Sequence, residues 1–331
     1  MDRAEQLHCW LKEVLGGEFT IAPASDDASF RRYFRVRRVA SLPSLIAMDA
    51  PPEKESCEPF VRVAKLFGEA GVHVPAVQAQ DLAQGFLLLS DLGDTTYLNA
   101  LESHSAGMLY GHALDALVRI QLVSRPGALP DYDRELLERE LRLFPDWYVS
   151  RQLRRELTSA EADSLDGVFS GILANNLAQP RVFVHRDYHS RNLMVSDPCP
   201  GILDFQDAVY GPITYDLVSL LRDAYIAWEE ERVIDWTVRF WEKARSARLP
   251  VAADFSDFYR DFEWMGVQRQ LKVLGIFARL ALRDGKNGYL KDQPLVMSYL
   301  RRTCERYRDL APLARLLDDL EVTERRVGYS F

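Results

Sequence analysis

The sequence has few cysteines, and their spacing does not form a metal-binding pattern. Four occur among 331 residues, and no two of them are close enough to form a C-x-x-C pair; they are Cys9, Cys57, Cys199 and Cys304. This argues against both a zinc site and a disulfide framework. A reducing compartment, and therefore the cytoplasm, is the simplest expectation.

An excess of basic residues is also absent. Lysine and arginine number 41 against 49 aspartates and glutamates, so the formal net charge is −8 and the pI is about 5.4. Nucleic-acid binders are usually basic, so a nucleic-acid partner is not expected. The negative charge would mildly favour a cationic ligand.

Long apolar runs are missing as well. No stretch approaches the roughly 18 residues that a membrane span requires, and the N-terminal segment has no apolar signal core. With 47% hydrophobic and 27% charged residues, the composition is ordinary for a globular protein. We therefore expect no membrane association, and a chain of this length suggests about two domains.

The apolar periodicity changes near residue 91. Before it, the pattern predicts strands at 19–22, 30–39, 45–48, 73–79 and 86–89, and helices at 4–15 and 56–69. After it, helical patterns dominate, at roughly 95–122, 133–153, 158–177, 213–224, 228–246, 254–283 and 292–317. We predict an α+β fold with a small β-rich lobe, a larger helical lobe and a ligand-binding cleft between them.

The stretch VFVHRDYHSRNLMV places polar residues between two apolar runs. His185-Arg186-Asp187, followed at the fifth position by Asn192, matches the kinase catalytic-loop pattern H-R-D-x-x-x-x-N. Phosphoryl transfer needs a carboxylate beside the accepting hydroxyl and an oxygen ligand for Mg²⁺. Asp187 is therefore the predicted base and Asn192 a predicted metal ligand.

A second metal ligand is expected one turn and one strand further on. The turn sequence SDPCPG precedes an apolar pair that ends at Asp204, so a hairpin would return Asp204 to the side of Asn192. Mg²⁺ prefers such oxygen ligands. A lone aspartate after a strand is more often a strand-end cap, but the three residues in this order favour a kinase.

These motifs resemble the aminoglycoside phosphotransferase-like kinases. The fingerprint of that family, H-x-D-x-x-x-x-N followed by I-D and a later Y-D, is matched by His185, Asp187, Asn192, Asp204, Tyr215 and Asp216. The resemblance implies a bilobal, protein-kinase-like fold that uses ATP and Mg²⁺. It also implies that residues 1–91 form the nucleotide-binding lobe and residues 92–331 the catalytic and sugar-binding lobe.

Stretches spread over nearly the whole chain are similar to the anomeric N-acetylmuramate/N-acetylglucosamine kinases of bacterial cell-wall recycling. Among them are DASFRRYF, MDAPP, GFLLLSDLGD, LFPDWYV, LDFQDAVYGP and MGVQRQLKVLGIFARL. The resemblance implies phosphorylation of the C1 hydroxyl of a free amino sugar in peptidoglycan recycling. It also implies a pathway partner, an N-acetylmuramate 1-phosphate uridylyltransferase, without a stable complex. An aminoglycoside or another small-molecule acceptor is the alternative, as is a nucleotide-binding pseudokinase.

The resemblance also implies supporting residues. His185 and Asp216 would hold the catalytic loop, although Asp216 is equally well placed to be a first-turn acid favoured by the helix dipole. A hinge at the end of the small lobe would bind adenine through backbone groups, and its candidate residues are Leu89, Ser90 and Leu92.

Two parts of a protein kinase are missing from the sequence. There is no G-x-G-x-x-G loop, and Met48 stands near the position of the expected strand lysine. In the corresponding loop, small residues such as Ser29 permit backbone N–H groups to face a phosphate. Arg32 is the predicted replacement cation, because an arginine fork suits phosphate. Arg31 is a second candidate, and snorkelling of Arg32 at a sheet edge is the alternative.

Several residues are candidates for binding the acceptor. The ring of Trp147 could stack on a sugar, and Arg269 and Lys272, one helical turn apart, could bind the lactyl carboxylate of N-acetylmuramate. Core packing of Trp147 and a solvated basic face are the alternatives. Near the catalytic loop, the candidates for sugar contact are Arg191, Gln206, Asp207 and Tyr210.

Overall fold

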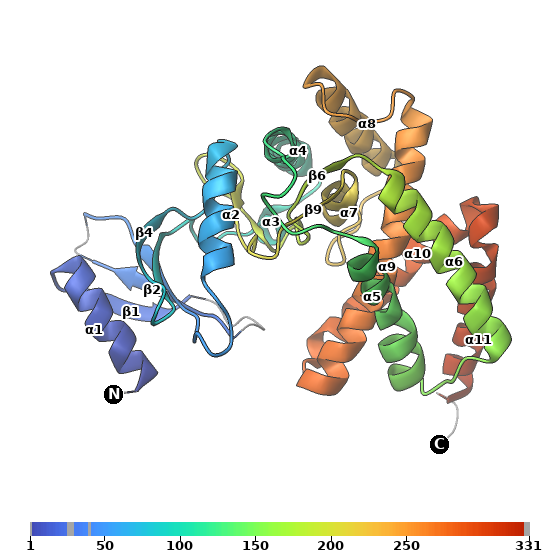
Figure 1. The fold of residues 1–331 in the computed structure, drawn as a ribbon, viewed down its shortest axis with the longest axis horizontal. Helices are drawn as coiled ribbons and strands as arrows, with labels where there is room; N and C mark the ends of the chain where they lie inside the picture. The colour runs from blue at the N-terminus through green and yellow to red at the C-terminus, as the bar shows by residue number, and fades with distance from the viewer. Residues whose placement is uncertain (1, 25–29, 39–40, 328–331) are drawn as a thin grey trace. The chain divides into compact units, whose positions relative to one another are not determined.

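The computed structural model describes residues 2–24, 30–38 and 41–327. It divides into two compact units (Figure 1). Unit 1 comprises Met1–Ala113 and Arg191–Asp207, and unit 2 comprises Leu114–Ser190 and Ala208–Phe331. A five-stranded sheet in unit 1 and long helices in unit 2 confirm the predicted α+β class. The predicted lobes, 1–91 and 92–331, differ from these units and stay a prediction.

A five-stranded antiparallel sheet forms the framework of unit 1. Its strands are β1 (Thr20–Pro23), β2 (Arg32–Arg37), β3 (Leu45–Asp49), β4 (Val77–Asp81) and β5 (Phe86–Ser90), in the spatial order β1-β2-β3-β5-β4. The ranges predicted from the sequence agree with the observed bounds of all five strands to within a few residues. The largest difference is at β4, which begins at Val77 rather than at residue 73. The near-continuous apolar runs of β3 and β5 match their central positions, where both faces of the sheet are covered.

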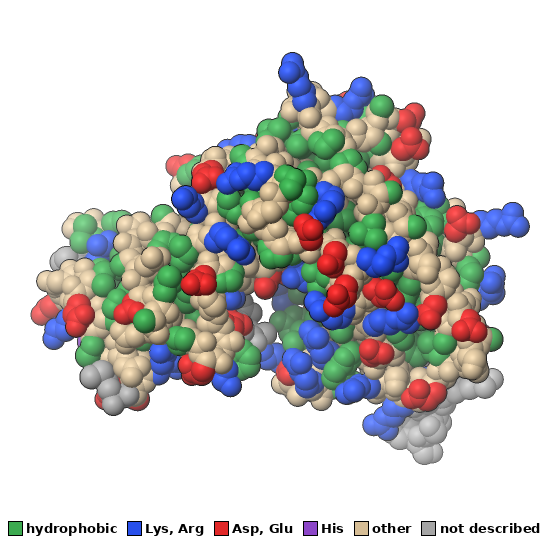
Figure 2. All heavy atoms as spheres, in the orientation of Figure 1, with side chains coloured by type: hydrophobic (Ala, Val, Ile, Leu, Met, Phe, Trp, Pro, Cys, Tyr) green, Lys and Arg blue, Asp and Glu red, His purple; other side chains and the backbone are tan. Residues whose placement is uncertain are grey.

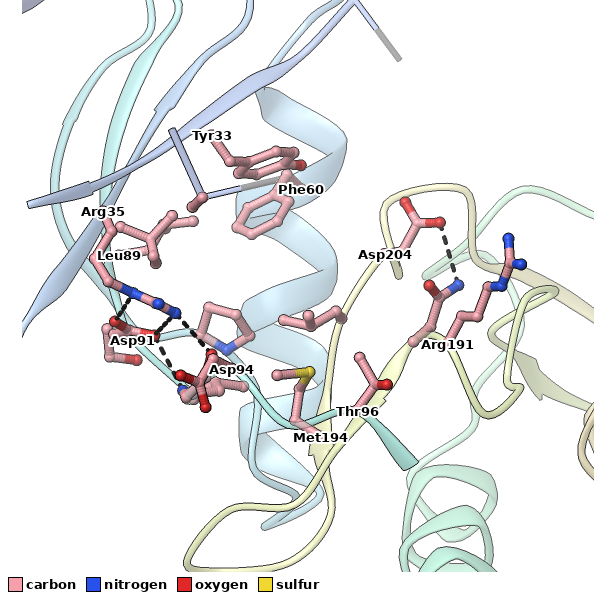
Figure 3. Close-up of a pocket in the computed structure, with 18 residues that line it drawn as sticks. Tyr33, Arg35, Phe60, Leu89, Asp91, Asp94, Thr96, Arg191, Met194 and Asp204 are labelled. Atoms are coloured by element: carbon pink, nitrogen blue, oxygen red, sulfur yellow. Dashed lines mark hydrogen bonds and ion pairs between the residues drawn. The ribbon is translucent and has the colours of Figure 1, made fainter. Parts of the chain in front are cut away.

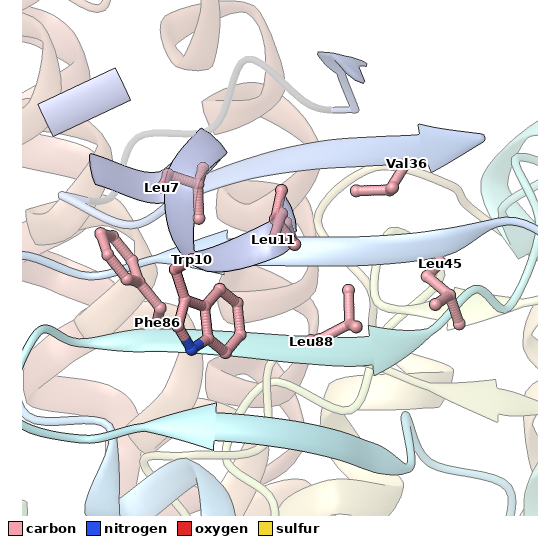
Figure 4. Close-up of a cluster of buried hydrophobic side chains, with 8 residues drawn as sticks. Leu7, Trp10, Leu11, Val36, Leu45, Phe86 and Leu88 are labelled. Atoms are coloured by element: carbon pink, nitrogen blue, oxygen red, sulfur yellow. The ribbon is translucent and has the colours of Figure 1, made fainter. Parts of the chain in front are cut away.

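Helix α1 (Arg3–Leu15) covers one face of this sheet. A capping box between Asp2 and Glu5 starts the helix, and Gly16 ends it in the left-handed conformation. The apolar stripe of α1 packs on alternate strand residues, and the resulting cluster (Figure 4) consists of Leu7, Trp10, Leu11, Val36, Leu45, Ala47, Phe86 and Leu88. Because strand side chains alternate, Ile46 and Leu89 belong to the opposite face, where α2 (Glu58–Glu69) lies (Figure 1).

The predicted helix over 95–122 is interrupted. The structure has a short α3 (Tyr97–Ala100) and then α4 (Ala106–Leu122), which continues from unit 1 into unit 2. Between them, the Ser105 hydroxyl donates to the Ala100 carbonyl at 2.8 Å and accepts from the Glu102 N–H at 2.9 Å. These local bonds compete with the helical ladder and end α3.

Unit 2 is built around one long helix, α9 (Phe255–Asp284). The other elements packed around it include α5 (Arg134–Leu143), α6 (Ser159–Ala178), α7 (Tyr215–Leu221), α8 (Glu230–Ser246) and α10 (Gln293–Arg306). Gly275 of α9 lies so close to α5 that a Cβ atom added to it would be 2.4 Å from the backbone of Leu143. Two short strands, β6 (Arg181–Val184) and β9 (Val209–Pro212), pair antiparallel in the same unit.

Two other predicted helices are also divided. The one over 133–153 continues past α5 as a π-helix, η1 (Phe144–Gln152), which has a proline at its start and therefore lacks one N–H donor there. The one over 292–317 is split into α10, the short 3₁₀ helix η3 (Arg308–Leu310), and α11 (Ala311–Val327). Pro312 stands in the first turn of α11, where a missing N–H costs least. A further 3₁₀ turn, η2 (Asn287–Asp292), precedes α10.

The surface agrees with the mixed charge of the sequence. On the face drawn in Figure 2, acidic and basic side chains are interspersed rather than gathered by sign. Over the described residues, none of the helices combines the length and the apolar character that crossing a membrane requires.

Candidate active site

A hairpin of unit 1 carries the two predicted metal ligands. Strands β7 (Leu193–Met194) and β8 (Gly201–Ile202) pair antiparallel, and just beyond them the Leu203 N–H donates to the Asn192 carbonyl at 2.9 Å. The Asn192 amide nitrogen lies 3.3 Å from Oδ2 of Asp204 (Figure 3). The structure thus brings together an amide and an exposed carboxylate that lie twelve positions apart in the chain. This hard-oxygen pair fits Mg²⁺.

The hairpin is anchored to the rest of unit 1. The ring of Phe205, next to Asp204, packs on Phe60 and Phe67 of α2, with ring centroids 4.8 and 5.8 Å away. The Ile202 N–H donates to the His73 carbonyl at 2.8 Å. Asp204 has a φ of +60°, a backbone conformation that aspartate tolerates better than most residues. These contacts hold the backbone from which the Asp204 side chain projects.

A pocket of about 290 Å³ lies in the same unit. Its lining includes the hinge candidates Leu89, Ser90 and Leu92, together with Asn192 and Asp204. Apolar walls are added by Tyr33, Ile46, Phe60, Pro75, Met194 and Leu203. In Figure 3 the rings of Tyr33 and Phe60 are turned towards the pocket. An apolar pocket with a few polar groups at one end is typical of a small-molecule site.

Arg35 is a pocket residue that the sequence did not single out. Its guanidinium donates to the Asp91 carboxylate at 2.7 and 3.2 Å and to the Gly93 carbonyl at 2.9 Å (Figure 3). The Ser44 hydroxyl also donates to Asp91, at 2.7 Å. These bonds tie the hinge segment to strand β2. Strand alternation could have found Arg35, because it shares the face of Tyr33.

The predicted phosphate-binding arginines have carboxylate partners elsewhere. Arg32 points to the α1 face of the sheet and donates to Asp49 at 3.1 Å, beside a second ion pair from Arg3 to Asp49. Arg31 pairs with Glu55 at 3.0 Å. The structure therefore does not bring Arg32 or Arg31 into the pocket lining. Met48 is fully buried in β3, and Ser29 lies outside the described residues.

The first part of the catalytic loop, from His185 to Ser190, belongs to unit 2 and follows strand β6 directly. The buried carboxylate of Asp216, in the first turn of α7, accepts the backbone N–H of His185 at 2.6 Å and of Arg186 at 3.0 Å. Further along, Ser190 donates its N–H to Asp223 at 2.9 Å. Burial raises the pKa of Asp216 to about 7, although the two N–H donors oppose that shift. Asp216 therefore lies where a loop-supporting residue must lie.

Asp187 follows this anchored pair. Partial burial acts to raise its pKa, but the nearby charges of Lys272, His189 and Arg269 outweigh burial and lower the pKa to about 2. The Asp187 carbonyl also accepts the His189 N–H at 3.0 Å, which closes a tight turn. Asp187 is consequently ionised at neutral pH, and its carboxylate can accept a hydrogen bond from a hydroxyl.

The two basic candidates on α9 differ in their surroundings. Both are buried, with exposed fractions of 5% for Arg269 and 7% for Lys272, so the alternative of a solvated basic face is wrong. The Lys272 ammonium donates to the Tyr215 hydroxyl at 2.9 Å and pairs with Glu140 at 3.1 Å. The side chain of Arg269, in contrast, makes no hydrogen bond or ion pair within the part of the chain that the structure describes, although its charge acts on Asp187 and Asp216.

The remaining acceptor candidates fall in both units. In unit 1, Arg191 lines the pocket, Gln206 donates to Asp204 at 2.8 Å, and Asp207 is exposed. In unit 2, Trp147 is half-buried in η1, with the Arg151 guanidinium 4.1 Å from its ring centroid. The guanidinium of Arg181 lies 4.6 Å from the ring centroid of Tyr210 in β9.

Several known proteins are similar to this chain over most of its length. The model of the phosphotransferase enzyme family matches residues 20–253. Two curated relatives named N-acetylmuramate/N-acetylglucosamine kinase are each 50% identical to the chain. The one from Neisseria meningitidis covers 100% of both chains, and the one from Pseudomonas aeruginosa covers 96% of this chain and 97% of the relative. A third of that name, from Caulobacter vibrioides, is 31% identical over 87% of this chain and 86% of its own.

Solved structures confirm the predicted protein-kinase-like fold. The choline/ethanolamine kinase family protein from Mesorhizobium loti superposes with a TM-score of 0.62 and 15% identity, covering 95% of this chain and 100% of its own. The ADP-bound aminoglycoside phosphotransferase APH(2'')-Ib gives a TM-score of 0.59 and 14% identity, and the match covers 89% of this chain and 97% of its own. At this identity the likeness concerns the fold alone.

Proposed function

Because this chain belongs to the phosphotransferase enzyme family, we propose that it transfers the terminal phosphoryl group of ATP to the anomeric hydroxyl of N-acetylmuramate and N-acetylglucosamine. The observation that carries this proposal is the similarity along almost the whole chain, at 50% identity, to proteins named for that activity. The catalytic-loop residues support it, because each has the chemistry that phosphoryl transfer needs.

ATP is assigned to the pocket of unit 1. The apolar walls and the segment Leu89–Leu92 suit a flat base that is bound through backbone groups, and Asn192 and Asp204 lie in the same lining, where phosphates would have to be. Arg35 holds that segment through Asp91 and Gly93. Neither Arg31 nor Arg32 lines the pocket, so neither replaces the missing strand lysine there. Arg191 does line the pocket, and it is the pocket arginine best suited to bind a phosphate.

Asn192 and Asp204 would hold Mg²⁺. Their side-chain oxygens are hard ligands, and they lie together at the end of an anchored hairpin. When bound, the ion would supply neutralisation of charge on the phosphates. Gln206 donates to the second oxygen of the Asp204 carboxylate and thereby orients it.

Asp187 is assigned as the base. Its carboxylate is ionised because its pKa is lowered to about 2, so it can accept the hydrogen bond of the C1 hydroxyl, orient that oxygen and take up its proton. Asp216 fixes the start of the loop through two backbone N–H groups. His185 contributes Nδ1 as the acceptor for the Asp187 N–H at 3.2 Å.

Arg269 is the preferred candidate for the lactyl carboxylate of N-acetylmuramate. A buried guanidinium that makes no hydrogen bond is costly, and a carboxylate matches its planar fork. Lys272 already has two internal partners, Glu140 and Tyr215. Because N-acetylglucosamine lacks the lactyl group, the two sugars provide a direct test of this role.

The product would be a sugar 1-phosphate in the cytoplasm, where ATP is available. A separate N-acetylmuramate 1-phosphate uridylyltransferase would then consume it, with no stable complex between the two enzymes. Trp147, Asp207 and Tyr210 remain proposed sugar contacts.

The function is tested by ³¹P NMR of the purified protein with ATP and Mg²⁺, in parallel tubes with N-acetylmuramate, N-acetylglucosamine and kanamycin. A new phosphate resonance coupled to the anomeric proton of a sugar is expected in the first two tubes. A product in the kanamycin tube alone would make the chain an aminoglycoside kinase. ADP binding without any product would favour the pseudokinase alternative.

A further inference from the structure

Glu140 is a buried acid to which neither the sequence motifs nor the proposed mechanism gives a role. It lies on α5 with 4% of its surface exposed. One carboxylate oxygen accepts from the Arg186 guanidinium at 2.5 Å and from the Lys272 ammonium at 3.1 Å, and the other accepts the Tyr132 hydroxyl. Arg186 is the middle residue of the His-Arg-Asp motif, so Glu140 contacts the catalytic loop directly.

The backbone of Arg186 explains why such an anchor is needed. Its φ is +77°, in the left-handed region that favours glycine, and an ordinary residue there costs about 1 kcal/mol or more. Among the bonds that hold it in place, its N–H donates to Asp216 and its guanidinium donates to Glu140. Since Asp187 comes next in the chain, the bonds of Arg186 to Asp216 and Glu140 determine how the Asp187 side chain is oriented.

Glu140 also controls where two cations lie. Lys272 and Arg186 both act electrostatically on Asp187 and both are bound to Glu140. Burial of a charge without a partner is costly. Without the negative charge of Glu140, Lys272 or Arg186 would have to find another anion, and Asp187 is the carboxylate whose charge they already feel. An ion pair at Asp187 would occupy the oxygens that the acceptor hydroxyl needs.

We propose that Glu140 is a positioning residue of the catalytic loop, which anchors Arg186 and keeps Lys272 away from the catalytic carboxylate. The role rests on the proposed kinase function, because Asp187 is the base of that reaction. Lys272 extends the network by donating to Tyr215, the neighbour of Asp216, so α5, α7 and α9 support the loop together. Glu140 touches neither substrate nor reacting atoms in this role.

The test is Glu140→Gln, which keeps the shape of the side chain and removes its charge. We expect kcat for both amino sugars to fall at least tenfold, whereas KM for ATP and for each sugar stays within threefold. The matched control is Glu138→Gln on the same helix, since Glu138 makes a half-exposed pair with Arg142 at 3.4 Å. The control should keep the wild-type kcat.

A second variant makes the result specific. In Glu140→Gln/Lys272→Met the released cation is gone, so kcat should recover severalfold relative to Glu140→Gln. A further loss in the double variant, or a wild-type kcat in Glu140→Gln, would overturn the proposal. If Glu140→Gln does not fold, the double variant, which restores the charge balance, is compared with Lys272→Met alone, and an equal kcat in the two would also overturn it.

Hydrogen exchange of the wild-type and Glu140→Gln proteins separates this proposal from the kinase function. In the variant, the amides of His185 and Arg186, which Asp216 holds, should exchange at least tenfold faster, with or without sugar. If the wild type phosphorylates neither sugar but this change occurs, the kinase assignment fails while the anchoring by Glu140 stands. Unchanged exchange together with unchanged kcat would reject the anchoring itself.

Discussion

Asp187 keeps its charge because of the cations that surround it. The carboxylate is partly buried, which by itself would favour the neutral acid. Lys272, His189 and Arg269 reverse that preference and lower its pKa to about 2. The contribution of Asp187 to folding stability is therefore present above its ordinary pKa of about 3.9 and is lost only as the pH falls towards 2.

Replacement of this charge gives the first prediction. Asp187→Asn should lower kcat by about 10²–10⁴-fold, because an amide cannot take up the proton of the acceptor hydroxyl. Binding of ADP with Mg²⁺, measured by isothermal titration calorimetry, should stay within threefold of the wild type. Asp131→Asn, at an exposed ion pair with Arg181 in the same unit, is the control. Wild-type turnover in Asp187→Asn would remove Asp187 from its role.

A second prediction concerns Arg269 and the identity of the sugar. A hydrogen bond to a charged group contributes about 1.5–3 kcal/mol, so Arg269→Gln should raise KM for N-acetylmuramate at least about tenfold. KM for N-acetylglucosamine should change less than twofold, because that sugar has no carboxylate. Arg260→Gln, an exposed position on the same helix, is the control. Equal effects on both sugars would instead place Arg269 at the transferred phosphoryl group.

At the scale of elements, Glu230 joins helices that are distant in sequence. It stands at the start of α8 and accepts hydrogen bonds from Arg222, next to α7, at 2.9 and 2.8 Å, and from Tyr259 of α9 at 2.9 Å. Arg302 and Arg306 of α10 donate to it at 2.8 and 3.1 Å. A single carboxylate thus connects four elements of unit 2.

Glu230→Gln should accordingly destabilise the protein by about 2 kcal/mol at pH 7, the size of a lost charge-assisted hydrogen bond. Burial acts to raise the pKa of Glu230, but the hydrogen bonds and charge of Arg222 lower it below the usual 4.5. A lowered pKa stabilises the fold fully above pH 4.5; this contribution declines as the pH falls below 4.5 and is lost only as the pH falls through the lowered pKa. Urea unfolding should therefore show a smaller difference from wild type at pH 3.5 than at pH 7.

The exposed neighbour Glu231 provides the control for this experiment. Glu231→Gln should change the free energy of unfolding by less than about 0.5 kcal/mol, as is usual for surface positions. Equal stability of Glu230→Gln and wild type at pH 7 would contradict the role given to Glu230.

The sequence predicted the site where spacing along the chain determines contact. Asn192 and Asp204 come together because a turn and two short strands separate them, and the loop from His185 to Asn192 is a local motif. Contacts between distant segments were not predictable in this way. Arg32 pairs with Asp49 across two strands, and Lys272 pairs with Glu140 of a distant helix. In both cases the partner depends on packing, which no spacing rule gives.

At the scale of the whole molecule, ligand binding should be visible as a change in unfolding temperature. A ligand at 100 times its Kd stabilises the folded state by about 2.7 kcal/mol. ADP with Mg²⁺ should therefore raise Tm more than ADP with EDTA. Asp204→Ala should abolish the difference between these two conditions, because the metal loses its carboxylate ligand. Asp197→Ala, an exposed aspartate in the turn of the same hairpin, should keep it.

The division of the chain into units affects how genes of this family can recombine. Unit 1 consists of two separate segments, Met1–Ala113 and Arg191–Asp207, and the second brings in the hairpin whose Phe205 packs on α2. A single crossover after residue 113 would join the sheet of one parent to the hairpin of another. An exchange that preserves this packing has to transfer both segments, so the proposed nucleotide pocket and its proposed metal ligands are expected to pass together only when both segments come from one parent.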